Sequence, residues 1–315
     1  MEYPLVVGVD GSDSSLEAVD WAVDEAARLG LSLRLVHASL WERYEGGLPS
    51  FGTGRPAEEV LAEHIAASAA ERARLRDPEL KVSSEVVPDD AVSALLHAAH
   101  ESSALVTGSR GRGGIAGMLL GSVSLTVAAR AVCPVVVVRG GEPDRQGSPG
   151  RVVVGLGDAA EDSDAVRFAF REAEARGCGL HAVRAWRRPA HEHVDHPLIA
   201  DDAAGAGEER ASALLAGAGE ERASALLAGA GEERASALLT DALRDAARDH
   251  PRVEVRRQGV EGPAHKALLD ASSGADLVVV GARRRHGHVG LQLGRVSHAL
   301  LHHAGCPVAV VPRSD

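Results

Sequence analysis

The chain has 315 residues, of which 45% are hydrophobic and only 3% aromatic, and its formal net charge is −11. This length and apolar content predict two domains with cores of Val, Leu and Ala, a composition that suits parallel sheets under small-residue helices. The negative charge argues against nucleic acid or an anionic membrane as the main partner, and no apolar run approaches the ~20 residues of a membrane span.

The three cysteines show no spacing typical of a metal site or a disulfide framework. They indicate reduced thiols packed in the protein interior. The first residues, Met-Glu-Tyr-Pro-Leu, do not have the pattern of a secretory signal. Together these features predict a cytoplasmic protein.

The first half of the chain alternates apolar strands with helices. The first predicted helix begins near Ser14, keeps one apolar face and ends at Gly30. The predicted strands cover residues 4–9, 33–38, 81–87, 104–107 and 135–139, and the other predicted helices cover 57–75, 89–100 and 123–131. Five strands that alternate with four helices predict a parallel sheet with helices on both faces.

The second half repeats this order after a stretch rich in Gly, Pro and charged residues. We therefore predict a first domain over residues 1–140, a linker over 141–150 and a second domain over 151–315. The predicted strands of the second domain cover 151–156, 180–185, 253–258, 277–280 and 308–311, and its helices include 163–176, 263–272 and 296–304.

Residues 205–240 hold three nearly identical 12-residue units, GAGEERASALLA twice and then GAGEERASALLT. Twelve residues advance a helix by whole turns plus roughly 120°, so the Leu-Leu pairs of successive units face different directions. Two glycines in each unit cost roughly 1 kcal/mol apiece against Ala. We interpret two units as a recent duplication inside one helix; a functional repeat array is the less favoured alternative, because three such short units do not form a solenoid.

A glycine-rich loop follows the predicted strand 104–107. Gly111 and Gly113 are expected to adopt positive φ and to let the backbone approach a ligand. Gly121 and Ser122 then open a helix, whose unpaired N–H groups and positive dipole end favour an anion. A strand, a glycine loop and a serine at the helix start predict a phosphate-binding site.

The spacing Gly108-x2-Gly111-x9-Gly121-Ser122 resembles the nucleotide-binding signature of the universal stress protein family. Residues 281–307, GARRRHGHVGLQLGRVSHALLHHAGCP, are similar to the same stretch without a gap. Since the resemblance covers nearly the whole chain, the protein is identified as a tandem member of the actinobacterial type. The resemblance implies two Rossmann-like domains, of the adenine nucleotide alpha hydrolase-like kind, each with a five-stranded parallel sheet and helices on both faces.

The resemblance also implies ATP as the ligand. From the residues themselves, Asp10 and Asp13 could hold Mg²⁺ beside the phosphates, which leaves slow ATP hydrolysis open. Asp10 would face the ribose, although it could instead cap the following helix, and Val36 would pack near the adenine, although it would be core in any such fold. Ser122 and Ser124 would bind phosphate, with Arg110 and Arg112 supplying charge, although the two arginines could equally belong to a solvated loop. The complete predicted set is Gly8, Asp10, Val36, Gly108, Ser109, Arg110, Gly111, Arg112, Gly121, Ser122, Val123 and Ser124 in the first half, and Gly281, Gly294 and Ser297 in the second.

The second half departs from the signature at three positions. Gly157 stands where the first half has Asp10, Arg284 replaces Gly111, and Arg295 replaces Ser122. A non-glycine residue where φ is positive costs energy, although the two arginines could themselves hold phosphate. We predict weak or absent nucleotide binding in this half.

No catalytic constellation is present in the sequence, and loop histidines such as His191 and His193 indicate a solvated surface more than a metal site. The predicted function is that of an ATP-binding stress-response regulator that acts through nucleotide-dependent conformation or partner binding. The alternatives are a slow ATPase that uses the same pocket and a nucleotide-independent interaction module. The resemblance further implies that the halves pair through their last strands, 135–138 and 308–311, and it allows two chains to form a homodimer.

Overall fold

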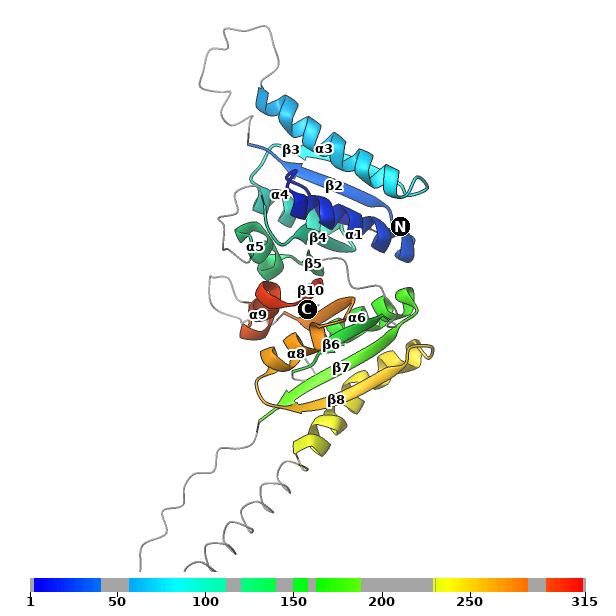
Figure 1. Ribbon diagram of the computed structural model, residues 1–315. Helices are drawn as coiled ribbons and strands as arrows, with labels where there is room; N and C mark the ends of the chain where they lie inside the picture. Colours follow the sequence, from blue (N-terminus) through cyan, green and yellow to red (C-terminus); the bar gives the residue numbers. More distant parts are fainter. Residues whose placement is uncertain are drawn as a thin grey trace, which may run out of the picture.

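The computed structural model describes residues 3–40, 57–111, 120–139, 150–157, 163–187, 229, 231–282 and 293–313. Figure 1 shows two α/β halves that follow one another along one sheet. The predicted linker 141–150 lies outside the described residues, except for Gly150.

Each half contributes five strands. They are β1 (Leu5–Gly8), β2 (Leu33–Ala38), β3 (Val82–Val87), β4 (Ala104–Gly108) and β5 (Val135–Val138), followed by β6 (Arg151–Gly155), β7 (Gly179–Trp186), β8 (Val255–Glu261), β9 (Leu277–Gly281) and β10 (Val308–Val311). Their order across the sheet is β3-β2-β1-β4-β5-β10-β9-β6-β7-β8. Within each half every pairing is parallel, which confirms the predicted α/β architecture.

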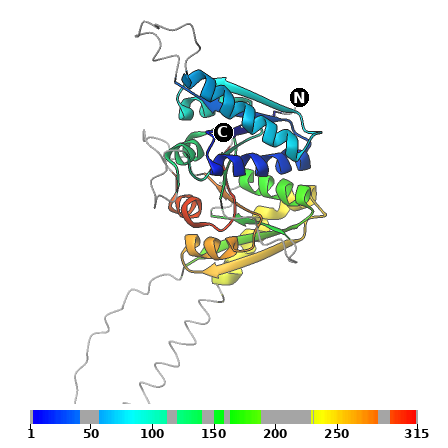
Figure 2. The same ribbon diagram turned by 45° about the horizontal axis from the view of Figure 1, so that its top comes forward.

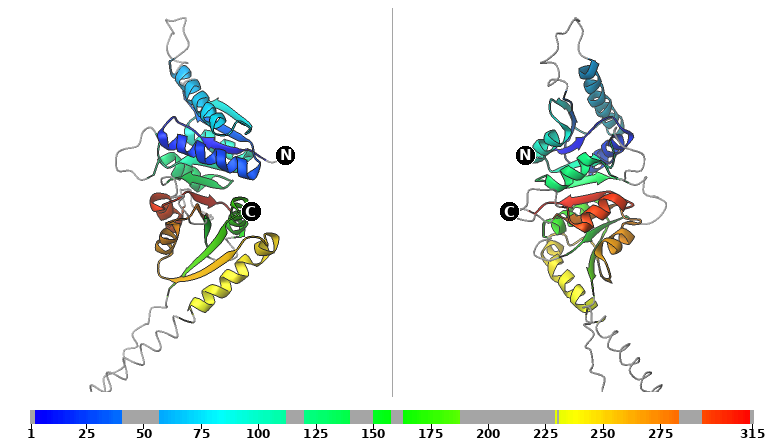
Figure 3. Two further views of the ribbon diagram at one scale, coloured as in Figure 1. Left: turned by 45° about the vertical axis from the view of Figure 1, so that its right-hand side comes forward. Right: turned by 90° about the vertical axis from the view of Figure 1, so that its left-hand side faces the viewer.

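The two halves meet where β5 and β10 pair antiparallel, with Val137 opposite Val308 and Val135 opposite Val310. Figure 3 shows these strands side by side in the middle of the molecule. Both strands are buried along their whole length, as expected for valine-rich strands covered on both faces. The edges of the ten-stranded sheet are therefore β3 and β8.

Helices cover both faces of the sheet and enclose two apolar cores. One face carries α1 (Asp13–Leu29), α3 (Ala57–Arg76), α6 (Ser163–Arg176) and a helix over residues 231–249, and the other carries α4 (Ala91–Ala98), α5 (Ser122–Arg130), α8 (Ala264–Ser272) and α9 (Arg295–His303). The second face also holds the 3-10 turn η1 (Ala99–Glu101), so the predicted helix 89–100 ends in a tightened turn. The predicted strand 253–258 begins two residues later, as β8.

The third 12-residue unit contributes residues 231–240 to the helix over 231–249 and packs into the core. Ala235 and Leu239 of this unit are buried, as is Leu243 beyond it. Packing also explains why residue 231 is a glycine, because a Cβ there would overlap the Trp186 ring. The first two units, and with them the predicted duplication, lie outside the described residues.

Two of the three cysteines are buried and the third is half-buried. Cys133, Cys178 and Cys306 are free thiols, and burial raises the pKa of Cys306 to about 12, which keeps this thiol protonated and unreactive.

Among the helices of the described ranges, none combines the length and the apolar character needed to cross a bilayer.

Candidate functional site

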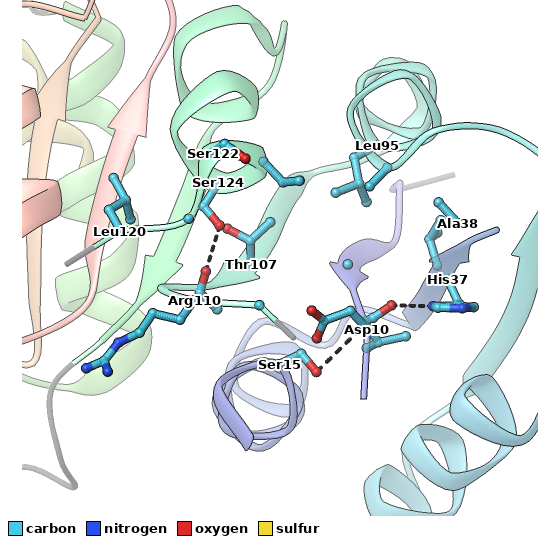
Figure 4. Close-up of a pocket in the computed structure, with 18 residues that line it drawn as sticks. Asp10, Ser15, His37, Ala38, Leu95, Thr107, Arg110, Leu120, Ser122 and Ser124 are labelled. Carbon is cyan, nitrogen blue, oxygen red and sulfur yellow. Dashed lines mark hydrogen bonds between the residues drawn. The ribbon is translucent and has the colours of Figure 1, made fainter. Parts of the chain in front are cut away.

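A cavity of about 490 Å³ opens in the first half at the carboxyl ends of β1, β2 and β4, between α4 and α5 (Figure 4). This is the edge at which open α/β sheets bind ligands, because the strand order reverses there. The residues predicted from the sequence that line the cavity are Gly8, Asp10, Val36, Gly108, Arg110, Gly111, Gly121, Ser122, Val123 and Ser124.

Two residues of the predicted set are not among those that line the cavity. Ser109 does not line the cavity; its carbonyl accepts a hydrogen bond from the Gly121 N–H at 2.8 Å and so ties the loop to the start of α5. Arg112 lies outside the described residues, as does Gly113.

Asp10 follows β1 and organises the start of α1. Its Oδ1 accepts hydrogen bonds from the backbone N–H of Ser12 at 3.0 Å and from the Ser12 hydroxyl at 2.6 Å. Ser12 is the N-cap of α1, and its hydroxyl accepts from the Ser15 N–H at 3.3 Å. Asp10 therefore orients the capping residue and does not itself cap the helix. Its Oδ2 is directed to Gly111, where a Cβ would lie 2.7 Å from this oxygen.

The prediction that Gly111 adopts positive φ is wrong. The described glycines with positive φ are Gly11, Gly30, Gly177, Gly262 and Gly274. The loop needs glycine at Gly111 because the backbone passes close to the Asp10 carboxylate, and a side chain would displace it. Gly108 is required for a similar reason, since a Cβ there would overlap the Ser14 carbonyl at the start of α1.

The start of α5 forms the polar end of the cavity. Gly121 is its N-cap and has extended backbone (φ −74°, ψ 146°), and no side chain caps the first N–H groups. These groups and the positive end of the helix dipole form an environment suited to an anion. The Ser124 hydroxyl donates to the Gly108 carbonyl at 2.7 Å, so it joins α5 to β4, while the exposed Ser122 begins the helix.

The opposite end of the cavity is apolar. Val36 on β2 is 1% exposed, and Leu95 on α4 is 4% exposed. Ala38 completes this end, and the His37 ring is held by a 2.8 Å hydrogen bond between its Nδ1 and the Val9 carbonyl (Figure 4). The Arg110 side chain is exposed and its guanidinium points away from the other labelled residues.

Sequence reasoning missed several lining residues, among them His37, Leu95 and Thr107. Leu95 comes from a helix whose position over the cavity depends on the tertiary fold. Thr107 could have been found from the sequence, because a polar residue near the end of an apolar, fully buried strand is unusual and indicates a possible site residue.

The second half has a smaller cavity of about 260 Å³ at the equivalent place. Its lining includes the predicted residues Gly281, Gly294 and Ser297, together with Gly157 and Arg295. Arg295 is the first residue of α9, whose N-cap is Gly294, again without a side-chain hydrogen bond. Arg284 and the loop histidines His191 and His193 lie outside the described residues. Within the described ranges, no three His, Cys, Asp or Glu side chains are arranged to hold a metal ion.

Comparison with known proteins gives a consistent result for the whole chain. The model of the Universal stress protein family matches residues 3–139 and again residues 149–312. A universal stress protein of Mycobacterium tuberculosis is 33% identical in an alignment 325 positions long, which covers 99% of this chain and 98% of the relative.

Two solved structures are also similar. A universal stress protein from Archaeoglobus fulgidus superimposes with a TM-score of 0.64 at 17% identity, covering 99% of this chain and 98% of that one. A universal stress protein solved in complex with cAMP is 34% identical, covers 44% of this chain and 98% of its own, and has a TM-score of 0.34. On the family match and the mycobacterial relative, the chain belongs to the universal stress protein family and carries two copies of its domain in tandem.

Proposed function

We propose that the first half binds ATP in its cavity and that the bound state serves as a regulatory signal in the stress response. The observation that carries this proposal is the polarity of the cavity. Val36 and Leu95 form an apolar end, the uncapped start of α5 forms an anion-binding end, and Asp10 lies between them (Figure 4). A base, a ribose and a phosphate chain require these environments in this order.

The size of the cavity supports the same ligand. Ligand pockets typically have volumes of about 300–1,000 Å³, a range that contains the first cavity and excludes the second. Asp10 is the carboxylate that could hold Mg²⁺ beside bound phosphates, because Asp13 is exposed on α1 and does not line the cavity. Mg²⁺ would neutralise phosphate charge there.

The contacts of Arg139 support a route by which the nucleotide could affect the second half. Arg139 follows β5, and its guanidinium donates a hydrogen bond to the Leu301 carbonyl in α9. Burial and the nearby positive charge of Arg110 lower the pKa of Arg139. The Arg110 guanidinium points away from the other site residues here, but if it paired with a bound phosphate this repulsion would be offset, and ligand binding in one half would change the electrostatic environment of a residue bound to the other.

The homodimer and the cytoplasmic location stay predictions. Because β5 and β10 pair with each other inside one chain, two chains would have to associate through another surface. The cytoplasmic location is supported by the three free thiols, which are typical of a reducing compartment.

The proposal is tested by releasing nucleotide from freshly purified protein with acid and quantifying it by chromatography. We expect about one ATP per chain. Ser122→Arg, which copies Arg295 of the second half, should abolish it, whereas Ser68→Arg on the exposed side of α3 should not.

Other outcomes would lead to different conclusions. About two ATP per chain would show that the second half also binds. ADP in place of ATP would favour the slow ATPase. No nucleotide, and none bound after addition of ATP and Mg²⁺, would refute the proposal and leave the interaction module.

A further inference from the structure

Thr107, the penultimate residue of β4, carries a polar group that the fold does not use. The residue is 4% exposed and lines the first cavity, yet its Oγ1 has no hydrogen-bond partner among the described residues. Native proteins pair nearly all buried polar groups, because an unpaired one costs free energy on folding. An unpaired hydroxyl in a cavity wall therefore needs a reason.

The position of Thr107 places its hydroxyl near the polar end of the cavity. Thr107 pairs with Val137 on β5, the strand on the side of α5, and the carbonyl of the next residue, Gly108, receives the Ser124 hydroxyl. In Figure 4 the Thr107 hydroxyl points toward the side formed by Ser122 and Ser124, and away from Leu95. The Ser124 hydroxyl donates to the Gly108 carbonyl, and no hydrogen bond joins it to the Thr107 hydroxyl.

The second half supplies an internal comparison. Val280 precedes Gly281 on β9 as Thr107 precedes Gly108 on β4, and Val280 is also 4% exposed and lines its own cavity. Valine and threonine have nearly the same shape and differ by a methyl group in place of a hydroxyl. The fold thus accepts an apolar residue at this position, and the half that has Asp10 and Ser122 carries the hydroxyl.

We propose that the Thr107 hydroxyl determines ligand specificity in the first cavity by donating a hydrogen bond to the phosphate end of the bound nucleotide. This inference rests on the proposed function. Phosphate oxygens only accept hydrogen bonds, and a hydroxyl is a donor that can rotate to suit them. The bond is charge-assisted and so among the stronger kinds. It favours a nucleotide over the nucleoside, which makes the same contacts with the apolar end but has no phosphate.

The test compares the wild type with Thr107→Val, which reproduces Val280, and with Thr107→Ser, which keeps the hydroxyl. Calorimetric titration with ATP and with adenosine, on protein stripped of nucleotide, gives the affinities. We expect Thr107→Val to weaken ATP binding about 10- to 100-fold, the range for a hydrogen bond to a charged group. Its adenosine affinity should stay unchanged, and Thr107→Ser should keep most of the ATP affinity.

Thermal unfolding of the same ligand-free proteins separates this role from a structural one. Thr107→Val should raise the unfolding midpoint, because it removes an unpaired buried hydroxyl, while it weakens ATP binding. The inference is overturned if Thr107→Val binds ATP like the wild type, if it loses ATP and adenosine affinity equally, or if it lowers the midpoint. Failure of the wild type to bind either ligand would refute the proposed function itself, and the inference with it.

Discussion

The two cavities occupy equivalent places in the two halves, yet the polar groups that line them differ. The first has Asp10, Thr107 and Ser122, where the second has Gly157, Val280 and Arg295. The backbone around both is similar, since each lies at the strand ends and at the uncapped start of a helix. The second half therefore has the same backbone arrangement around a smaller cavity and lacks the groups that we assign to ribose and phosphate.

At the contact between α1 and α6, unlike at the cavities, the two halves carry the same residue type at equivalent positions. Figure 2 shows the two helices side by side. Glu25 and Glu172 lie at equivalent positions, five residues before the glycines that end their helices, and each side chain is 2% exposed. Arg176 joins them, with one nitrogen 2.5 Å from Glu25 and the other 2.5 Å from Glu172. The two halves thus differ at their ligand sites and share a buried glutamate at the surface that joins them, where Arg176 of the second half has Leu29 as its counterpart in the first.

The largest effect is expected where the halves are joined. Arg176→Met would leave the buried Glu172 without its cation and Glu25 with Arg28 alone, and loss of one partner of a buried ion pair costs about 3–5 kcal/mol. Denaturant unfolding should show this loss. Arg167→Met on the same helix breaks an ion pair whose arginine is 66% exposed, so it should cost less than about 1 kcal/mol. Equal effects of the two substitutions would show that the α1–α6 contact does not hold the halves together.

A smaller effect on stability is expected at Gly108, the last residue of β4, where the backbone lies close to α1. Gly108→Ala would drive a Cβ into the Ser14 carbonyl, and such overpacking against backbone costs about 1–3 kcal/mol. Gly121→Ala is the matched control, because its Cβ would come no closer than 3.7 Å to the nearest neighbours. Thermal unfolding of both variants measures the difference. If Gly108→Ala unfolds like Gly121→Ala, the close contact between β4 and α1 is not what requires glycine.

The features that could be predicted from the sequence are those set by local pattern. The strands, the helix starts and the position of Asp10 after β1 follow from short apolar runs and capping residues. The conformation of Gly111 could not be predicted, because it depends on how closely the loop approaches Asp10. Contacts between residues far apart in the sequence could not be predicted either. Glu25 and Arg176 lie 151 residues apart, and no local pattern relates them.

The α1–α6 contact should also make stability depend on pH. Burial, reinforced by the adjacent Glu25, raises the pKa of Glu172 to about 8. The native protein therefore keeps a proton that the unfolded chain releases above its ordinary pKa near 4.5. The contribution of Glu172 is most favourable below pH 4.5, declines as the pH rises, and levels off above about 8, where the native state also ionises.

Glu172→Gln cannot ionise and should remove this decline. Its stability relative to the wild type should rise steadily from pH 5 to pH 8 when both are unfolded with denaturant at each pH. Glu17→Gln, on the exposed side of α1, serves as the control and should show no such trend. A constant difference between Glu172→Gln and the wild type across this range would show that Glu172 is already ionised at pH 5. Arg176 would then neutralise both glutamates, and the joining surface would be a plain ion-pair network with no titrating group near neutral pH.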